Sequence, residues 1–206
     1  MQLLAALEQR LGLDCRLEVD SNAAVVAEYR YGGGRGSMRL LGVTVGTGLG
    51  GGVIIEGALL RYTGECAGDV GHIILDPKGR RCSCGAQGCL EALVCSAALS
   101  ERVAGRPVRD VVTSAKRGDQ LAMAALADTA RWLGLGLASL SPLFAPDRIV
   151  VGGGVAAAGD LLLEPTRASY RTHASPEFRN VQVVGSSFDG WEGMVGAASL
   201  VLDPLE

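Results

Sequence analysis

One histidine and three nearby cysteines place the strongest constraint on how this chain can fold. His72, Cys82, Cys84 and Cys89 follow the spacing H-x9-C-x-C-x4-C. One neutral imidazole and three thiolates make a good four-ligand set for zinc, and four protein ligands leave no open position on the ion. The spacing therefore predicts a structural zinc site in a zinc-binding loop. The alternative is three buried free cysteines beside an unrelated histidine.

Composition and charge indicate a cytoplasmic protein. The 206-residue chain is 48% hydrophobic and 20% charged, which suits a sizeable buried core. Its net charge is −3 and it has no basic block, which argues against a nucleic-acid partner for this chain. No apolar run reaches the roughly 18 residues that a membrane span needs, and the first residues lack the basic start and cleavage site of a signal peptide.

Hydrophobic periodicity predicts an α/β fold, and we expect one compact lobe over residues 1–206. Helices are expected over 2–12, 21–32, 90–104, 119–141, 159–173 and 191–202. Strands are expected over 15–20, 39–46, 52–62 (with a turn at or near Glu56-Gly57), 148–154 and 181–184. Residues 63–89 have little periodicity and are expected to form a functional loop.

Two of the predicted strands run into glycine-rich turns. The segment VTVGTGLGGGV (43–53) matches neither a P-loop nor a dinucleotide-binding turn, and a second strand follows it, so we expect a β-hairpin whose backbone amides can cradle a phosphate. The segment RIVVGGGVAAAG (148–159) could admit a nucleotide base or ribose against bare backbone. The key residues are Gly46, Thr47 and Gly48 in the first turn, and Gly152, Gly153 and Gly154 in the second. The alternative is that each of these two segments forms only a tight turn and binds no ligand.

Three carboxylates are candidates for site chemistry. Asp20 precedes a predicted helix, whose N-terminus would stabilise the negative charge of the carboxylate. A carboxylate held there can serve as a general base. The alternative is that Asp20 is only the N-cap residue of this helix. Asp69 lies three residues before His72, and Glu91 lies two residues after Cys89. A zinc ion would fix both acids in space, in a manner suited to sugar hydroxyls. The alternative is that they are solvated loop charges.

The order of these motifs resembles the ROK family of repressors, open reading frames and kinases. The resemblance rests on VDSNAAVVAE (19–28), VTVGTGLGGG (43–52), GDVGH…CSCGAQGCLE (68–91) and IVVGGGV (149–155). It implies an actin-like ATPase, or ribonuclease H-like, fold. It also implies a function as a sugar kinase or a sugar-responsive transcription factor, commonly as a homodimer or higher homo-oligomer.

The resemblance also implies a role for each candidate residue. Asp20 would take the proton from a sugar hydroxyl that attacks the γ-phosphate of ATP, with Mg²⁺ present. Asp69, His72 and Glu91 would hold hydroxyls of a hexose or N-acetylhexosamine. Gly46, Thr47 and Gly48 would face the ATP phosphates, and Gly153 and Gly154 would lie by the adenosine.

Departures from the family pattern leave the function open. Val19 stands where the family usually has Asn, and Asp69 stands where it usually has Glu. The chain has no D-x-G-G-T loop, so we expect it to be the C-terminal lobe alone, without the N-terminal phosphate-loop lobe, and to be inactive by itself. A ROK sugar kinase is the leading hypothesis. A sugar-sensing, dimerising regulator module and a zinc-stabilised lobe without ligand function are the alternatives.

Overall fold

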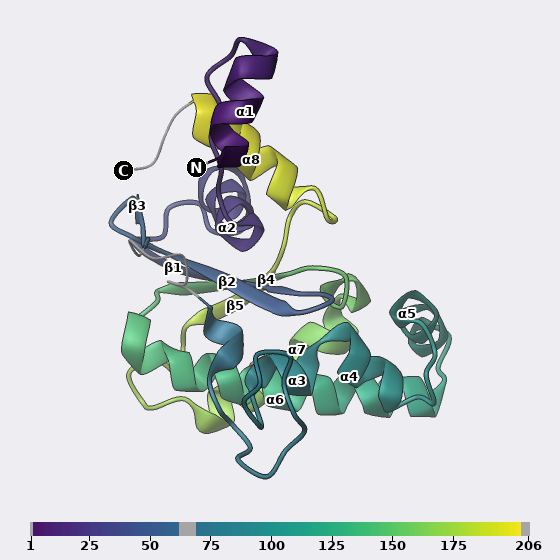
Figure 1. The fold of residues 1–206 in the computed structure, drawn as a ribbon. Coiled ribbons are helices and arrows are strands. Elements are labelled where there is room, and N and C mark those ends of the chain that lie inside the picture. The colour runs from purple at the N-terminus through teal and green to yellow at the C-terminus, as the bar shows by residue number, and fades with distance from the viewer. Residues whose placement is uncertain (1, 62–68, 203–206) are drawn as a thin grey trace.

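A five-stranded mixed sheet forms the centre of the computed structural model, which describes residues 2–61 and 69–202 (Figure 1). The strand order is β3-β2-β1-β4-β5. β1 pairs antiparallel with β2 and parallel with β4, and β4 pairs parallel with β5. The strands are β1 (Arg39–Val45), β2 (Leu49–Ile55), β3 (Ala58–Leu59), β4 (Arg148–Gly152) and β5 (Gln182–Gly185).

Helices cover both faces of the sheet. On one face α2 (Asp20–Tyr31) lies beside α8 (Glu192–Leu202), with α1 (Gln2–Leu11) beyond them (Figure 1). The opposite face carries α3 (Leu90–Val94), α4 (Ser96–Glu101), α5 (Val108–Lys116), α6 (Gln120–Phe144) and α7 (Asp160–His173). Two short 3-10 helices, η1 (Val70–His72) and η2 (Ala156–Ala158), lie in connecting segments. Among the described residues, no helix is both long and apolar enough to cross a bilayer.

Alternation along β1 divides the apolar core into two layers. Leu41, Val43 and Val45 belong to the large cluster on the α6 and α7 side. Leu40 belongs to a smaller cluster with Val25 of α2 on the other side. Successive side chains of a strand point to opposite faces, so one strand supplies both layers. Burying each of these side chains contributes about 1.5–3 kcal/mol, which fixes the sheet against the helices on either side.

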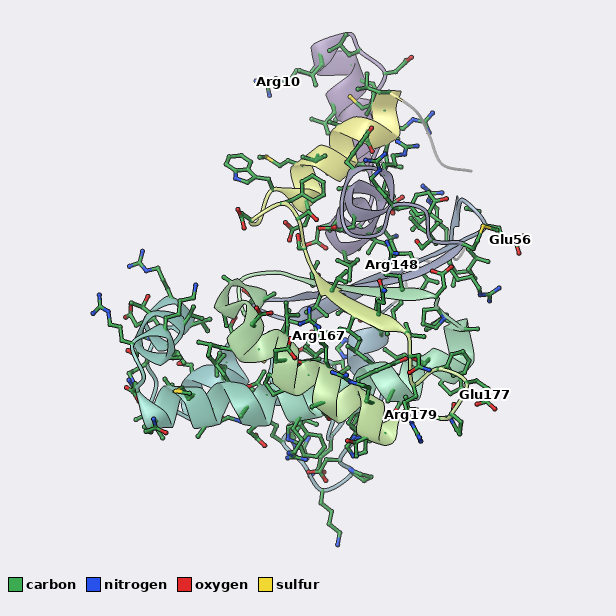
Figure 2. All side chains as sticks on the ribbon, turned by 180° about the vertical axis from the view of Figure 1, so that it is seen from behind. Arg10, Glu56, Arg148, Arg167, Glu177 and Arg179 are labelled. Carbon is green, nitrogen blue, oxygen red and sulfur yellow. The ribbon has the colours of Figure 1, made fainter. Side chains whose placement is uncertain are left out.

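The sheet is also tied to the loop that follows α2. Arg148 at the start of β4 donates to the carbonyl oxygens of Gly33 and Arg35 at 2.9 and 3.0 Å (Figure 2). The parallel strands β1 and β4 therefore begin at a fixed position relative to α2. Because β1 and β4 are parallel neighbours, their carboxyl ends lie next to each other at the far end of the strands.

Several predicted elements are corrected by the structure. The strand expected over 15–20 is wrong: residues 14–19 have no regular structure, and Leu17 and Val19 are about half exposed. The helix expected over 90–104 is two helices, α3 and α4, which meet at an extended Cys95. Helix α5 was not predicted. Helix α2 begins one residue early, at Asp20.

The glycine hairpin was located correctly, but its second strand was misplaced. β2 begins at Leu49 rather than at residue 52, and the chain turns at Glu56-Gly57 before the short β3, as expected. Residues 69–89 form an irregular loop, as predicted, with η1 and two isolated bridges. The remainder of that predicted loop, including Cys66, and the last residue of the strand expected over 52–62 lie outside the described residues.

Candidate functional site

One cavity of about 490 Å³ brings together most of the predicted site residues. It lies where the turn between β1 and β2, the start of α2 and the region of η1 and α3 meet. The predicted residues that line it are Asp20, Gly46, Thr47, Gly48, Asp69, His72, Glu91 and Gly153. Gly154 does not line it. The lining also includes Val19, Ser21, Thr44 and Leu49, of which only Val19 had been singled out.

Asp20 occupies the first position of α2. Val19 is the N-cap residue, and Asp20 Oδ1 accepts a hydrogen bond of 2.7 Å from the Ser21 amide. A carboxylate in the first helical turn is stabilised by the positive end of the helix dipole. The side chain is exposed to the cavity and, among the described residues, its second oxygen has no hydrogen-bond partner. One oxygen is thus anchored while the other can contact a ligand.

Glu18 holds the backbone immediately before Asp20. Its Oε1 accepts hydrogen bonds from the Val19 amide at 3.0 Å and from Asn22 Nδ2 at 2.9 Å, and its Oε2 accepts from Arg61 Nε at 2.9 Å. Partial burial opposes ionisation of Glu18, but hydrogen bonds from Asn22 and Arg61 hold its pKa below the usual range. Sequence reasoning missed this role. The only available signal was a Glu four residues before an Asn at a helix start.

The turn of the hairpin is closed and anchored by backbone hydrogen bonds. The Gly46 amide donates to the Gly48 carbonyl oxygen at 2.9 Å, and the Ser96 amide donates to the Gly46 carbonyl oxygen at 2.7 Å. Glu91 Oε2 accepts from the Leu49 amide at 3.0 Å. A Cβ on Gly48 would lie 2.6 Å from Glu91 Oε2. Because Gly48 has no Cβ, the turn can lie this close to the carboxylate of Glu91 in α3.

Two amides in this turn remain available to a ligand. Within the part of the chain that the structure describes, the amides of Thr47 and Gly48 have no acceptor. Consecutive free backbone amides are a common binding element for phosphate groups. Gly153, which lines the same cavity, has a φ of +89° and packs so closely on Val45 that a Cβ would lie 2.5 Å from the Val45 carbonyl oxygen. Both glycine-rich turns thus meet at one place, although the second contributes through Gly153 rather than Gly154.

Glu91 connects the hairpin to the cysteine-containing loop. Besides its contact with Leu49, its Oε1 accepts from Ser83 Oγ at 3.0 Å and lies 3.5 Å from Cys82 Sγ. Partial burial opposes ionisation of Glu91, but hydrogen bonds from Leu49 and Ser83 keep its pKa below the usual range. Glu91 is therefore an anionic acceptor at neutral pH. The contact with Ser83 was not foreseen.

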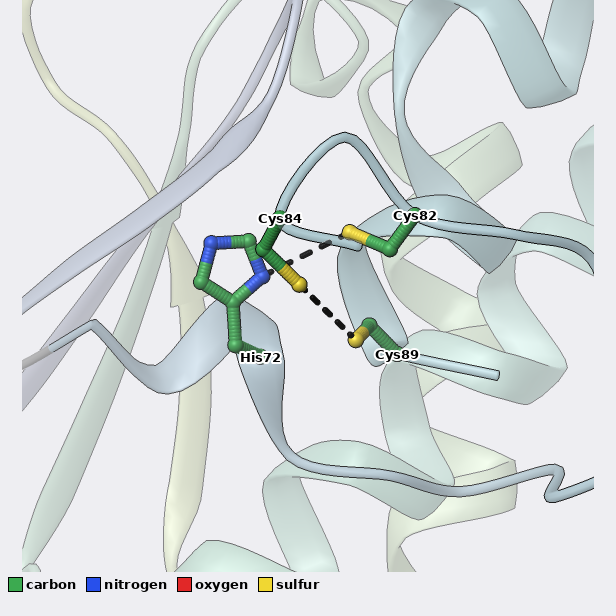
Figure 3. A group of neighbouring side chains, drawn as sticks. All are labelled: His72, Cys82, Cys84 and Cys89. Atoms are coloured by element: carbon green, nitrogen blue, oxygen red, sulfur yellow. Dashed lines mark hydrogen bonds between the residues drawn. The ribbon is translucent and has the colours of Figure 1, made fainter. Parts of the chain in front are cut away.

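His72, Cys82, Cys84 and Cys89 form a compact cluster (Figure 3). Their ligand atoms all lie within 4.8 Å of one another; Cys82 Sγ is 3.5 Å from His72 Nδ1, and Cys84 Sγ is 3.7 Å from Cys89 Sγ. In tetrahedral zinc sites, Zn–S bonds of about 2.3 Å and Zn–N bonds of about 2.0 Å separate ligand atoms by roughly 3.5–3.8 Å. The donor set and its spacing therefore fit a zinc ion.

Two thiols of the cluster differ in acidity before any metal binds. Burial raises the pKa of Cys89 to about 12, whereas a hydrogen bond from the Ala86 amide lowers the pKa of the exposed Cys84. Thiols bind metals as thiolates, so an incoming cation must displace the Cys89 proton. Metal affinity at this cluster should consequently rise with pH.

His72 lies between the cluster and the cavity. Its Nδ1 faces Cys82, and its Nε2 lies 3.5 Å from Asp69 Oδ2. If Nδ1 binds a metal, Nε2 remains to donate a hydrogen bond on the cavity side, where Asp69 and Glu91 also lie. The imidazole can therefore bind a metal through Nδ1 and donate a hydrogen bond to a cavity ligand through Nε2 at the same time.

Comparison with known proteins identifies the family. The family model for ROK matches residues 1–204. The chain belongs to the ROK family. Glucokinase of Streptomyces coelicolor is 37% identical over 222 residues, covering 96% of this chain and 70% of the glucokinase. The DNA-binding transcriptional repressor Mlc of Escherichia coli is 31% identical over 220 residues, covering 100% of this chain and 54% of the repressor.

Solved ROK structures share this fold in both functional branches. A glucokinase from Streptomyces griseus, in complex with glucose and AMPPNP, matches with a TM-score of 0.87 and 37% identity over 96% of this chain and 71% of that one. A ROK transcriptional regulator homologous to Escherichia coli Mlc matches with a TM-score of 0.84 and 29% identity over 95% and 54%. The expected α/β, actin-like ATPase fold is confirmed. Because kinases and regulators share it, the choice between them must come from the site.

Proposed function

We propose that this chain forms the larger lobe of a ROK-type ATP-dependent sugar kinase, which phosphorylates a hydroxyl of a hexose or N-acetylhexosamine. The observation that carries the proposal is a single cavity containing a carboxylate at a helix N-terminus, an anchored turn with free amides, and a group of acids and an imidazole. Similarity to glucokinases over 96% of the chain supports it.

The acidic residues of the cavity would bind and activate the sugar. Asp69, His72 and Glu91 offer acceptors and a donor that suit vicinal hydroxyls, and their positions are coupled through the cluster. Asp20 would act as the general base, since a base must lie within hydrogen-bond reach of the proton that it removes. Glu18 would keep Asp20 in place by fixing the preceding amide.

The two glycine-rich turns would hold ATP. The amides of Thr47 and Gly48, next to Gly46, would donate to phosphate oxygens, and the backbone at Gly153 and Gly154 would lie beside the adenosine. Mg²⁺ carried by ATP would neutralise charge on the phosphates during transfer. Positioning and charge stabilisation are thus the main contributions asked of the protein.

The cluster of Figure 3 would hold a structural zinc ion through His72, Cys82, Cys84 and Cys89. Four protein ligands saturate tetrahedral zinc, so the ion would order the loop rather than take part in the reaction. Its effect on the site would be indirect, through the orientation of His72 and through Glu91, which lies beside Cys82.

The test compares two aspartates that occupy the same kind of position. Asp20→Asn should abolish sugar-dependent ADP release by the intact protein that carries this chain, while glucose or N-acetylglucosamine binding, measured by calorimetry, changes little. Asp110→Asn is the matched control, because Asp110 also lies in the first turn of a helix but does not line the cavity. Turnover retained by Asp20→Asn at the level of the control would show that Asp20 only stabilises the first turn of α2.

A sugar-sensing, dimerising module without catalysis is the second candidate. It is favoured by Val19, an exposed apolar residue in the cavity wall, and by relatives that include the repressor Mlc. Calorimetry with both ligands separates the two candidates. Binding of sugar together with AMPPNP supports the kinase, whereas binding of sugar alone supports the regulator module.

A further inference from the structure

Two hydroxyl groups in the wall of the 490 Å³ cavity have no role in the site described above. They belong to Ser21, the second residue of α2, and to Thr44 of β1, and both residues line the cavity. Among the described residues, neither hydroxyl has a hydrogen-bond partner. Both hydroxyls are therefore free to donate to a ligand in the cavity.

Ser21 differs in this respect from the other buried hydroxyls. It is only 6% exposed. Every other buried serine or threonine among the described residues donates its hydroxyl to a backbone carbonyl oxygen: Ser37, Thr129, Ser141, Thr166 and Ser199. Ser21 lies in the first turn of its helix, so the helix has no carbonyl four residues earlier to accept its proton. Buried polar groups normally have a partner, and for Ser21 the cavity is the place where one can bind.

Gly50 brings the two hydroxyls to one place. It is the cross-strand partner of Thr44 in the hairpin. A Cβ built on Gly50 would lie 2.8 Å from Ser21 Cβ, 3.1 Å from Ser21 Oγ and 3.3 Å from Thr44 Oγ1. Because Gly50 has no side chain, Ser21 can lie against the hairpin, and both hydroxyl oxygens lie within 3.3 Å of one point. The two hydroxyls can therefore contact oxygen atoms of the same ligand group.

Strand alternation places these hydroxyls on one side of the hairpin. Val43 and Val45 belong to the core on the α6 side, so Thr44 between them faces α2 (Figure 1). Glu91 lies on α3, which covers the α6 side of the sheet (Figure 1). The cavity thus has an α2 side, with the two hydroxyls and Asp20, and an opposite side with Glu91.

The charges of the cavity wall indicate which ligand group suits the α2 side. No lysine or arginine lines the cavity, whereas Asp20, Asp69 and Glu91 do. A phosphate group bound here must therefore be held by uncharged donors, with Mg²⁺ offsetting part of its charge. Hydrogen bonds to a charged acceptor are stronger than those between neutral groups. A free hydroxyl consequently gains more from a phosphate oxygen than from a sugar hydroxyl.

We infer that Ser21 and Thr44 donate hydrogen bonds to oxygen atoms of the γ-phosphoryl group of ATP and hold that group beside Asp20. This inference rests on the proposed function. In the transfer, the sugar oxygen forms a bond to phosphorus and its proton goes to Asp20. The bond between phosphorus and the oxygen shared with the β-phosphate breaks, and ADP leaves with that electron pair. The two hydroxyls keep their protons and act only through hydrogen bonds.

Calorimetry with AMPPNP, ADP and glucose tests the inference without turnover. AMPPNP carries a γ-phosphoryl group and ADP does not, so a contact to that group changes only the affinity for AMPPNP. The intact protein that carries this chain is titrated in the presence of Mg²⁺. Ser21→Ala and Thr44→Val should each weaken AMPPNP binding by at least about tenfold and leave ADP and glucose affinity within about twofold. The kcat of sugar-dependent ADP release should fall by a similar or larger factor.

Two further variants separate a ligand contact from a structural effect. Thr44→Ser keeps the hydroxyl and should retain the AMPPNP affinity that Thr44→Val loses. Ser37→Ala is the matched control, because Ser37 is also 6% exposed but does not line the cavity, and it should leave all three affinities unchanged. The melting temperature gives an independent check. Ser37→Ala removes a hydrogen bond to Gly34 and should lower it, whereas Ser21→Ala removes a hydroxyl without a protein partner and should not.

Three outcomes would overturn the inference. If the wild type binds AMPPNP and turns over, and both Ser21→Ala and Thr44→Val match it, the hydroxyls do not contact the phosphoryl group, although the proposed kinase function stands. If these variants lose affinity for glucose and not for AMPPNP, the hydroxyls bind the sugar instead. If the wild type binds glucose but not AMPPNP, the proposed kinase function and this inference fail together.

Discussion

Removing the carboxylate of Glu91 should loosen the hairpin turn by a predictable amount. Glu91→Ala leaves the amide of Leu49, a fully buried residue, without its acceptor, and such a loss costs about 1–3 kcal/mol. The bond from Ser83 is exposed and adds little. We therefore expect a loss of about 2 kcal/mol, which lowers the melting temperature of a chain this size by about 4–8 °C.

Two further variants separate the hydrogen bond from the charge. Glu91→Gln keeps an acceptor for Leu49, so its melting temperature should fall by less than about 4 °C. Glu101→Gln, which breaks an exposed ion pair with Arg80 at 2.6 Å, should cost at most about 1 kcal/mol. Differential scanning calorimetry measures all three. The reasoning fails if Glu91→Ala is no less stable than Glu101→Gln, or if Glu91→Gln is as unstable as Glu91→Ala.

Three other predictions concern the metal cluster, sugar affinity and pH. Elemental analysis should find about one zinc equivalent in the wild type and none in Cys84→Ser, which should also melt lower; metal-free wild type would refute this. Val19→Asn should add one hydrogen bond to a sugar hydroxyl and improve affinity by about two- to tenfold in calorimetry, and unchanged affinity would refute it. Partial burial opposes ionisation of Asp128, but Arg131 and Arg102 lower the pKa of its carboxyl group. The ionised carboxylate therefore stabilises the fold at neutral pH. This stabilisation is lost as the pH falls through the lowered pKa. The melting-temperature difference between wild type and Asp128→Asn should therefore shrink below about pH 4, and a constant difference would contradict the reasoning.

The sequence predicted best those elements whose local pattern agrees with their burial. In β1 the apolar residues match a strand buried on both faces, with Leu41, Val43 and Val45 on one side and Leu40 on the other. The segment before α2 fails because its alternating Leu17 and Val19 are exposed, so no core holds them in a sheet. The break at Cys95 depends on a distant contact, since the following amide bonds to the hairpin turn. Local periodicity cannot reveal such a contact.

The same distinction applies to the candidate site. Motif residues such as Asp20 and His72 were found because their spacing or their neighbours carry a chemical signal. Glu18 and Ser83 were missed because their roles depend on which backbone groups the fold brings beside them.

The anchored hairpin turn also has a consequence for the thermodynamics of anion binding. Bonds to Glu91 and from Ser96 fix the turn in the absence of a ligand, so an anion that bound to its free amides would cost little conformational entropy. A glycine-rich segment would otherwise lose more freedom on ordering than any other kind of sequence. Here the turn loses this conformational entropy when the chain folds, so the same entropy would not be lost again on binding.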